Sequence, residues 1–142
     1  MSLYSVLYAT NPSTPEAAIA AAFPEHVVQV ASDRSMVQTN ALRASARPRT
    51  RPNFDLELLG FEPAVSIYFA IDKDRSAEAR QQLAAAIRAF LDGTSGDVAL
   101  TYLDTLVLKR LGDTAICAAS YADMLPNRAA GWTIVPELAQ PE

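Results

Sequence analysis

The side chains that could carry acid-base chemistry in this chain are two pairs of carboxylates and its only histidine. Asp55 is paired with Glu57 and Asp72 with Asp74, each at a spacing of two residues, and His26 follows a predicted helix and a proline. Paired carboxylates serve as general acid and general base only where a cleft raises the pKa of one of them. At strand edges and helix starts such residues usually cap the backbone or face solvent. Neither pair by itself therefore predicts a catalytic site.

Other catalytic and cofactor chemistries have little support in the sequence. His26 has no second histidine, and its combination with Glu25 or Asp33 matches no zinc-ligand spacing. The chain has five glycines, and the segment "GTSG" lacks the lysine that completes a phosphate-binding loop. Cys117 is the only cysteine, which excludes an internal disulfide, and its apolar and small neighbours predict a core residue. We expect no catalytic residue, no metal and no cofactor.

The stretch "YLDTLVLKRLGD" contains Asp104, Lys109 and Arg110 between apolar residues. Alternation along a strand places Lys109 and Arg110 on opposite faces of a sheet, so both cannot reach one substrate. Asp104 and Thr105 have the composition of a turn. This stretch is therefore predicted to be scaffold.

The only local basic run contains Arg43, Arg47, Arg49 and Arg51. Pro48 follows Arg47 and Pro52 follows Arg51. This composition favours an exposed loop over a central strand. The arginines could bind phosphate or an acidic partner. Alternatively, they form a solvated loop near the acidic segment "NFDLELLGFEP". No aromatic residue interleaves them, which argues against a nucleic-acid platform.

The elements that position these residues follow from hydrophobic periodicity and capping signals. Thr14 and Pro15 indicate the start of a helix that ends before Pro24. A second helix is predicted to be capped by Asp74 or Ser76 and to be ended by Gly93 in a left-handed conformation. Strands are predicted for "SLYSVLYAT", for residues 27–30 and 36–42, and for "AVSIYFAID", "VALTYL", "LVLKRLG" and "TAICAAS".

This order predicts an α+β fold, a two-layer sandwich in which a mostly antiparallel sheet carries two helices on one face. The last three of these strands form a C-terminal β-meander, and Trp132 and Ile134 pack back on the body. The second helix could instead cross over between parallel strands, which would make part of the sheet mixed. We expect one domain spanning residues 1–142, because no repeat or linker is visible.

Composition narrows the classes of partner and the location. Half of the residues are hydrophobic, and the net charge is -4, which argues against a general nucleic-acid binder. No apolar run is long enough to cross a bilayer, and the first residues lack the basic start of a signal peptide. These features predict a cytoplasmic protein that binds neither membrane nor nucleic acid.

The segment "EPAVSIYFAIDKDRSAEARQQLAAAIRAFLDGTSGDVALTYLDTLVLKRLGD" resembles the SitI3 family of bacterial immunity proteins. A proline precedes a strand ending in "DK", a helix leads to a "GD-A-L" segment, and a second strand reads "D-LVLKRLG". The likeness covers roughly Glu62 to Gly112, with a weaker one at Ile134 to Leu138. It implies a non-catalytic protein that binds and neutralises a cognate bacterial toxin delivered between neighbouring cells.

The resemblance supplies no contact residues, so the contact prediction comes from the sequence. Arginine and aromatic residues dominate interface hot spots, which favours the four arginines together with Tyr121 and Trp132. In the alternative, Trp132 is core and the arginine loop only solvated. Two rival functions stay open: a small-molecule module with a pocket between helices and sheet, and an acid-base enzyme built on Asp72, Asp74 or His26. A homodimer through the meander is compatible with each.

Overall fold

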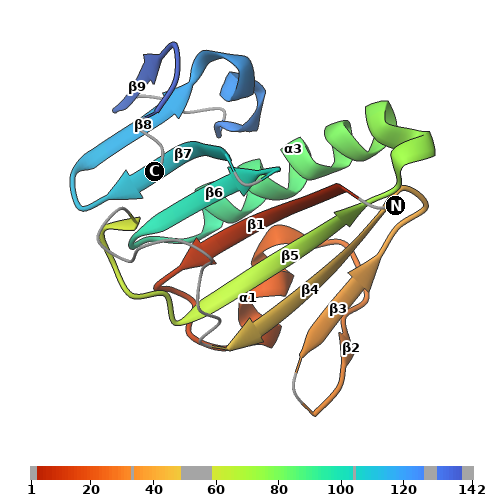
Figure 1. The fold of residues 1–142 in the computed structure, drawn as a ribbon. Coiled ribbons are helices and arrows are strands. Elements are labelled where there is room, and N and C mark those ends of the chain that lie inside the picture. The colour runs from red at the N-terminus through yellow and green to blue at the C-terminus, as the bar shows by residue number, and fades with distance from the viewer. Residues whose placement is uncertain (1–2, 33, 49–58, 104, 127–130, 139–142) are drawn as a thin grey trace.

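A computed structural model describes residues 3–32, 34–48, 59–103, 105–126 and 131–138 of the chain (Figure 1). The elements, in chain order, are β1 (Leu3–Ala9), α1 (Pro15–Ala22), β2 (Gln29–Val30), β3 (Ser35–Gln38), β4 (Leu42–Pro48), β5 (Val65–Ile71), the 3-10 turn η1 (Lys73–Arg75), α3 (Ser76–Gly93), β6 (Val98–Tyr102), β7 (Thr105–Leu111), β8 (Thr114–Ala118), the 3-10 segment η2 (Ala119–Met124) and β9 (Trp132–Val135).

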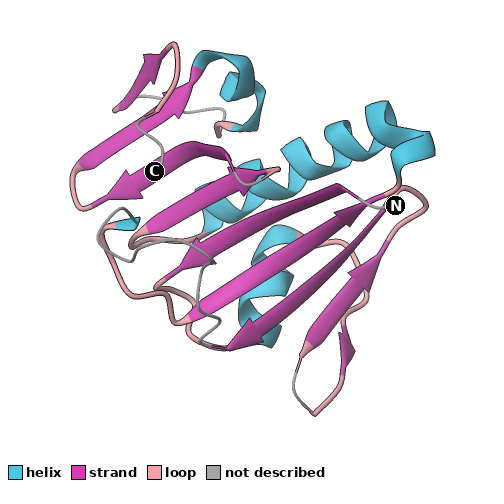
Figure 2. Cartoon of the chain, viewed as in Figure 1, coloured by secondary structure: helices cyan, strands magenta, loops and turns pink. Residues whose placement is uncertain are grey.

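The strands form one sheet in the order β2-β3-β4-β5-β1-β6-β7-β8-β9. Every neighbouring pair is antiparallel except β8 and β9, which run parallel. Both α1 and α3 lie behind the sheet in Figure 2, on the same face. The predicted α+β fold, with a mostly antiparallel sheet and two helices on one face, is confirmed, and so is the meander of β6, β7 and β8.

The first strand of the sequence lies in the middle of the sheet. β1 pairs with β5 on one side and β6 on the other, so that Leu7 faces Ile67 and Leu100. These three side chains are fully buried under the helices. Apolar residues occur on both faces of β1, which is typical of a central strand.

The connection through α3 has the crossover form considered above. β5 and β6 are each antiparallel to β1, so they run in the same direction as each other. Because β1 occupies the place between them, the crossover produces no parallel neighbours. The parallel pair of the sheet is instead β8 and β9, joined through η2.

The helix starts agree with prediction for α1 and differ for α3. Thr14 caps α1 by accepting a hydrogen bond from the Ala17 N–H at 3.3 Å. The α3 helix is preceded by η1, and the carboxylate of Asp72 caps this turn by accepting from the Asp74 N–H at 2.9 Å. The predicted caps Asp74 and Ser76 are therefore wrong, because the extra turn moves the capping position back to the end of β5. Gly93 is the last residue of α3, and its φ is not positive.

Apolar residues fill both sides of the sheet, but unequally. On the helix side a continuous core joins α1 and α3 to the sheet, with Phe69, Phe90 and Ile19 fully buried. On the opposite side, a smaller cluster around Tyr8, Leu59, Ala99, Leu106, Ala118 and Leu138 covers β1, β6, β7 and β8. The part of this side formed by β3, β4 and β5 lies outside that cluster. None of the helices in the described residues is long and apolar enough to cross a membrane.

Candidate functional site

The structure places Arg43 and Arg47 in strand β4, so the predicted loop is wrong at these positions. β4 is paired on both sides, with β3 and with β5. Leu42, Ala44 and Ala46 point to the helix side and are almost completely buried, which leaves the arginines on the other face. Alanine on the buried face lets α1 pack closely against β4. The other two arginines of the run, Arg49 and Arg51, lie outside the described residues.

Cross-strand register explains why the sheet is hollowed beside these arginines. On the face away from the helices, Arg43 lies opposite Ala70, which lies opposite Tyr4 on the next strand. In the next row Ser45 lies opposite Tyr68. The small side chains of Ala70 and Ser45 are thus surrounded by long ones, because residues of one face stand side by side at about 5 Å.

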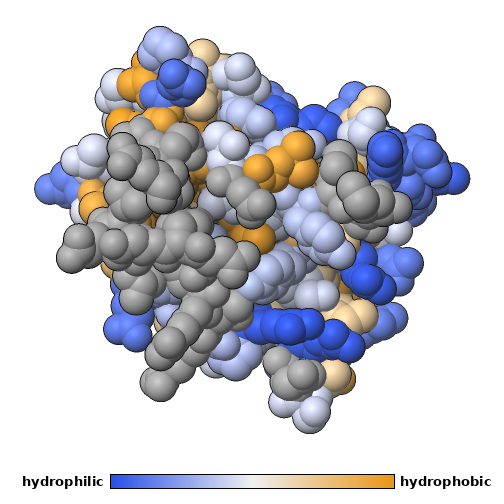
Figure 3. Space-filling model, in the orientation of Figure 1, coloured by the Kyte–Doolittle hydropathy of each residue, from blue (hydrophilic) through white to orange (hydrophobic). Residues whose placement is uncertain are grey.

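The result is a hollow of about 380 Å³ over β3, β4, β5 and β1. We call it the arginine hollow; it is lined by Tyr4, Arg34, Met36, Arg43, Ser45, Arg47, Tyr68 and Ala70. Figure 3 looks onto this face of the molecule and shows strongly hydrophilic side chains over the β3 and β4 side of the sheet. The hollow is the place where residues from four strands and one turn meet.

The described residues that line the arginine hollow carry a net positive charge. Its lining includes three arginines, and no Asp or Glu lines it within the described part of the chain. The salt bridges found among the described residues involve Arg75 and Arg80, not these three. The Cζ of Arg47 lies 5.9 Å from the ring centre of Tyr68, at the range of a cation–π contact. The Nε of Arg34 is buried and has no hydrogen-bond partner among the residues that the structure describes.

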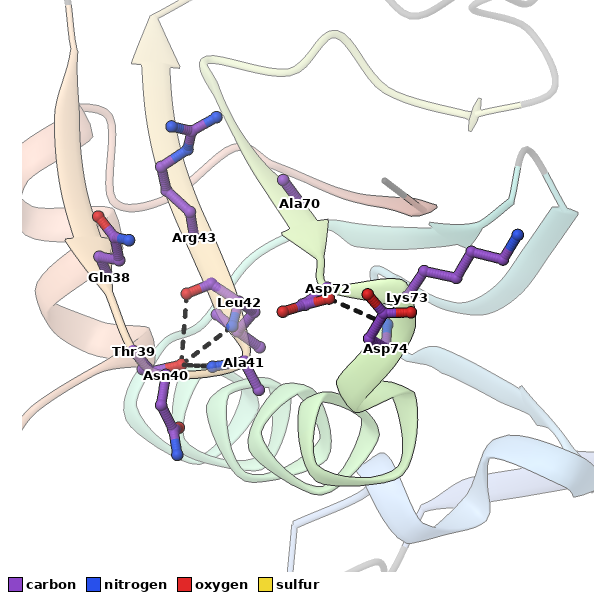
Figure 4. Close-up of a pocket in the computed structure, with 10 residues that line it drawn as sticks. All are labelled: Gln38, Thr39, Asn40, Ala41, Leu42, Arg43, Ala70, Asp72, Lys73 and Asp74. Atoms are coloured by element: carbon purple, nitrogen blue, oxygen red, sulfur yellow. Dashed lines mark hydrogen bonds between the residues drawn. The ribbon is translucent and has the colours of Figure 1, made fainter. Parts of the chain in front are cut away.

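A second hollow, of about 370 Å³, lies at the end of the sheet beside η1 (Figure 4). Several of its polar groups are already engaged in hydrogen bonds. The Thr39 hydroxyl accepts hydrogen bonds from the Ala41 and Leu42 N–H groups at 3.3 and 3.1 Å and contacts Gln82. Asn40 bridges to Glu78 and Gln82 on α3. This hollow is therefore a junction that ties the β3–β4 turn to α3.

Those residues proposed for acid-base chemistry that the structure describes do not assemble into a site. Asp72 and Asp74 are both exposed, and the Asp72 carboxylate is occupied in capping η1. His26 is exposed and stacks edge-on against Phe23, with ring centres 5.4 Å apart. Among the residues that the structure describes, no group of His, Cys, Asp and Glu could hold a metal ion. Asp55 and Glu57 lie outside the described residues.

The Lys109-Arg110 pair has the predicted arrangement on opposite faces. Arg110 reaches the C-terminal end of α3 and donates to the carbonyls of Gly96 and Leu91 at 2.9 and 3.1 Å, and to the Thr94 hydroxyl at 3.3 Å. Burial lowers the pKa of the Arg110 guanidinium, and the nearby charge of Asp97 opposes this effect. Lys109 lies on the other face, beside Gly60. Asp104 is outside the described residues.

The predicted contact residues of the tail have structural neighbours far from the arginine hollow. Tyr121 is half-buried between the Tyr102 ring, 5.6 Å away, and the Arg80 guanidinium, 4.5 Å away. Arg80 also forms a salt bridge of 2.8 Å with Asp123, which fixes η2 on α3. Trp132 in β9 packs partly buried against the helix-side core. The predicted packing of Ile134 is wrong, because 48% of this side chain is exposed.

Cys117 is a core residue, as predicted. Its side chain is completely buried in β8. Burial and the nearby charge of Asp123 raise the pKa of the thiol to about 11, and Arg80 opposes the shift. Such a thiol stays protonated at neutral pH and lacks the nucleophilic thiolate.

Comparison with known proteins identifies the family. A sequence model described as SitI3-like matches residues 4–127. The chain belongs to this family. The match extends the resemblance seen at Glu62 to Gly112 back to β1, whereas the weaker likeness at Ile134 to Leu138 lies beyond it. No curated protein and no solved structure matches the chain.

All of the residues that line the arginine hollow lie within the part that matches the SitI3-like family. Sequence reasoning found Arg43 and Arg47 but missed Arg34, Tyr4 and Tyr68. The two tyrosines carried a usable signal, because both alternate with core residues of confidently predicted strands and so face away from the helices. Arg34 precedes β3 in a turn and carried no such signal.

Proposed function

We propose that this SitI3-like protein is an immunity protein that binds a cognate bacterial toxin and neutralises it without catalysis. The observation that carries the proposal is the family match, which spans most of the chain. Neutralisation of this kind requires only that a surface of the inhibitor covers the toxin's active or recognition surface, or holds it in an inactive shape. Complementary shape and charge then decide which toxin is accepted.

The arginine hollow is the contact surface we propose. Interface hot spots are enriched in arginine and tyrosine, and this hollow presents three arginines and two tyrosines on a rigid sheet. Tyr4 is 55% exposed although it is large and aromatic. Arg49 and Arg51 follow β4 in the chain and stay part of the proposed contact region. Tyr121 and Trp132 are better explained by the packing of η2 and β9.

Co-expression tests the function directly. The chain is produced in bacteria together with the product of the adjacent upstream gene, in the cytoplasm, and growth is scored with and without the immunity protein. We expect rescue of growth and tight one-to-one binding by calorimetry. Toxicity without rescue, or rescue without binding, contradicts the proposal. A mass measured in solution shows whether the free protein is a monomer or a homodimer.

The rival small-molecule function has less support. That hypothesis placed a pocket between the helices and the sheet, where the structure has a continuous apolar core. The two hollows described above lie elsewhere, on the face away from the helices and at the end of the sheet. A third hollow, of about 280 Å³, lies between the start of α1 and the turn from β2 to β3, at the edge of this core. An intact-mass spectrum of the native protein after purification would reveal a bound metabolite.

A further inference from the structure

The arginine hollow has the opposite charge to the molecule that carries it. The whole chain has a net charge of -4, yet the hollow is lined by Arg34, Arg43 and Arg47 with no acidic side chain among its described residues. At physiological salt, charges act over a range of about 8 Å. A partner group inside the hollow therefore experiences the arginines and not the net charge of the protein.

Two arginines of β4 stand on either side of one small residue. Arg43 and Arg47 point to the same face of β4 and are separated along the strand by roughly 13 Å, at about 3.3 Å per residue. Ser45 lies between them and is small, so it leaves room above the strand. A guanidinium binds a carboxylate through two parallel hydrogen bonds, which makes arginine well suited to recognise this group.

Two further features concern unpaired groups at the hollow within the described part of the chain. Among these residues the buried Arg34 Nε has no acceptor, and a buried donor without a partner is unfavourable. Tyr4 stands at the rim with more than half of its side chain exposed. An acceptor bound in the hollow would pair with the arginine and cover part of the tyrosine.

We propose that the arginine hollow recognises an acidic segment of the partner protein and binds an Asp or Glu side chain between Arg43 and Arg47. This inference rests on the proposed function and specifies that the contacted toxin surface is acidic. The negative net charge of the immunity protein alone would have suggested a basic toxin surface. A nucleic acid fits less well. It needs a basic groove that follows its backbone, whereas the lining of this hollow also includes Met36 and two tyrosines beside the three arginines.

The first experiment needs no toxin. The isotope-labelled protein is titrated at low salt with an N-acetylated, amidated hexaglutamate peptide, with the matching hexalysine peptide, and with a ten-nucleotide oligouridylate. Backbone amide signals of β4 and β5 report on the hollow by nuclear magnetic resonance. We expect hexaglutamate to shift the signals of Ser45 and Tyr68 and hexalysine to leave them unchanged. Absence of a shift with hexaglutamate, or tighter binding of the oligouridylate, overturns the proposal.

Matched variants separate local recognition from net charge. Arg43→Gln with Arg47→Gln removes two positive charges from the hollow, and Lys73→Gln with Arg75→Gln removes two at exposed positions of η1. We expect the first double variant to weaken binding of hexaglutamate by roughly tenfold or more and the second to change it little. Equal weakening by both variants would contradict recognition in the hollow.

The same two variants then distinguish the inference from the proposed function. In calorimetry with the cognate toxin, the hollow variant is expected to lose roughly tenfold or more in affinity and part of its salt dependence. If the toxin binds both variants as tightly as the wild type, the immunity function stands and the hollow is not its contact. If no toxin binds the wild type, the immunity function fails, and the peptide titration still decides whether the hollow accepts carboxylates.

Discussion

Arg110 connects the sheet to the end of α3, and its removal is expected to destabilise the whole fold. Its guanidinium donates to the carbonyl oxygens of Leu91 and Gly96 and to the hydroxyl of Thr94, at 3.1, 2.9 and 3.3 Å. A cation at the C-terminal end of a helix is also favoured by the helix dipole. Methionine at position 110 would keep most of the aliphatic stem and lose all three hydrogen bonds, so the Arg110→Met variant isolates the polar contribution.

The size of the effect follows from these three bonds. Each hydrogen bond contributes roughly 1 kcal/mol net to the free energy of unfolding. The favourable interaction with the helix dipole is offset by the cost of desolvating the guanidinium, which also lowers its pKa. The free energy of unfolding should therefore fall by about 2–3 kcal/mol. For a chain of this length that corresponds to a decrease in melting temperature of about 7–10 °C.

Urea denaturation followed by circular dichroism measures this change. The matched control is Arg43→Met, an exposed arginine of β4 with no salt bridge to any described residue, which should alter stability by about 0.5 kcal/mol or less. Arg110→Lys keeps the charge but cannot reach three acceptors in different directions, so an intermediate loss is expected. The reasoning is refuted if Arg110→Met and Arg43→Met have the same midpoint and slope.

Two other predictions concern a buried thiol and a tight turn. The Cys117 thiol should react with a disulfide reagent at pH 8 only as fast as the protein unfolds. The pKa of this thiol is raised from 9.0 to about 11, so the folded state holds the thiol proton more tightly than the unfolded state does. The resulting contribution to the free energy of unfolding is complete below pH 9 and should be lost as the pH rises to about 11. A Cys117→Ser variant should lack this pH dependence. Gly96→Ala should destabilise the fold by roughly 2 kcal/mol in the same denaturation assay, because Gly96 has φ +98° and a Cβ would lie 2.8 Å from the Thr10 hydroxyl. Gly93→Ala, where a Cβ meets nothing within 4 Å, should leave stability unchanged or raise it by about 0.5 kcal/mol, and equal losses in the two variants would contradict the steric argument.

Local sequence signals were sufficient to predict the start of a helix and the two faces of a strand. Thr14 followed by Pro15 marked the start of α1, because a capping hydroxyl and a fixed φ act within one turn. Alternation in β5 gave the correct faces, with Val65, Ile67 and Phe69 buried toward the helices. These predictions needed no information about the rest of the chain.

Strand β4 was missed for a physical reason. Alanine and arginine are weak strand formers, and Pro48 suggested a loop. The strand forms because neighbours on both sides supply its hydrogen bonds and α1 covers Ala44 and Ala46, which are fully buried. A period of two was present in the sequence, but its buried members were too small to be recognised as a hydrophobic face.

The candidate site could be predicted only in part, because it depends on strand order. Arg43 and Arg47 were visible as a basic run, whereas Tyr4 comes from the first strand and Tyr68 from a later one. Their meeting requires β1 to lie beside β5 and β5 beside β4. The aromatic residues that appeared to be missing around the arginines are therefore supplied across the sheet.

The central place of β1 also determines the order in which the protein can complete its fold during synthesis. Ser5 pairs with Phe69 on one side and Tyr102 on the other, so β1 leaves the ribosome long before either partner strand exists. Until β6 has emerged, β1 has a partner only on its β5 side, and the β6–β9 half of the sheet cannot attach. Contacts so distant in sequence give a high contact order, and refolding in milliseconds to seconds is expected. The nascent chain therefore carries the apolar strand β1 unpaired until β5 has emerged, and a chaperone that holds it is expected to raise the yield.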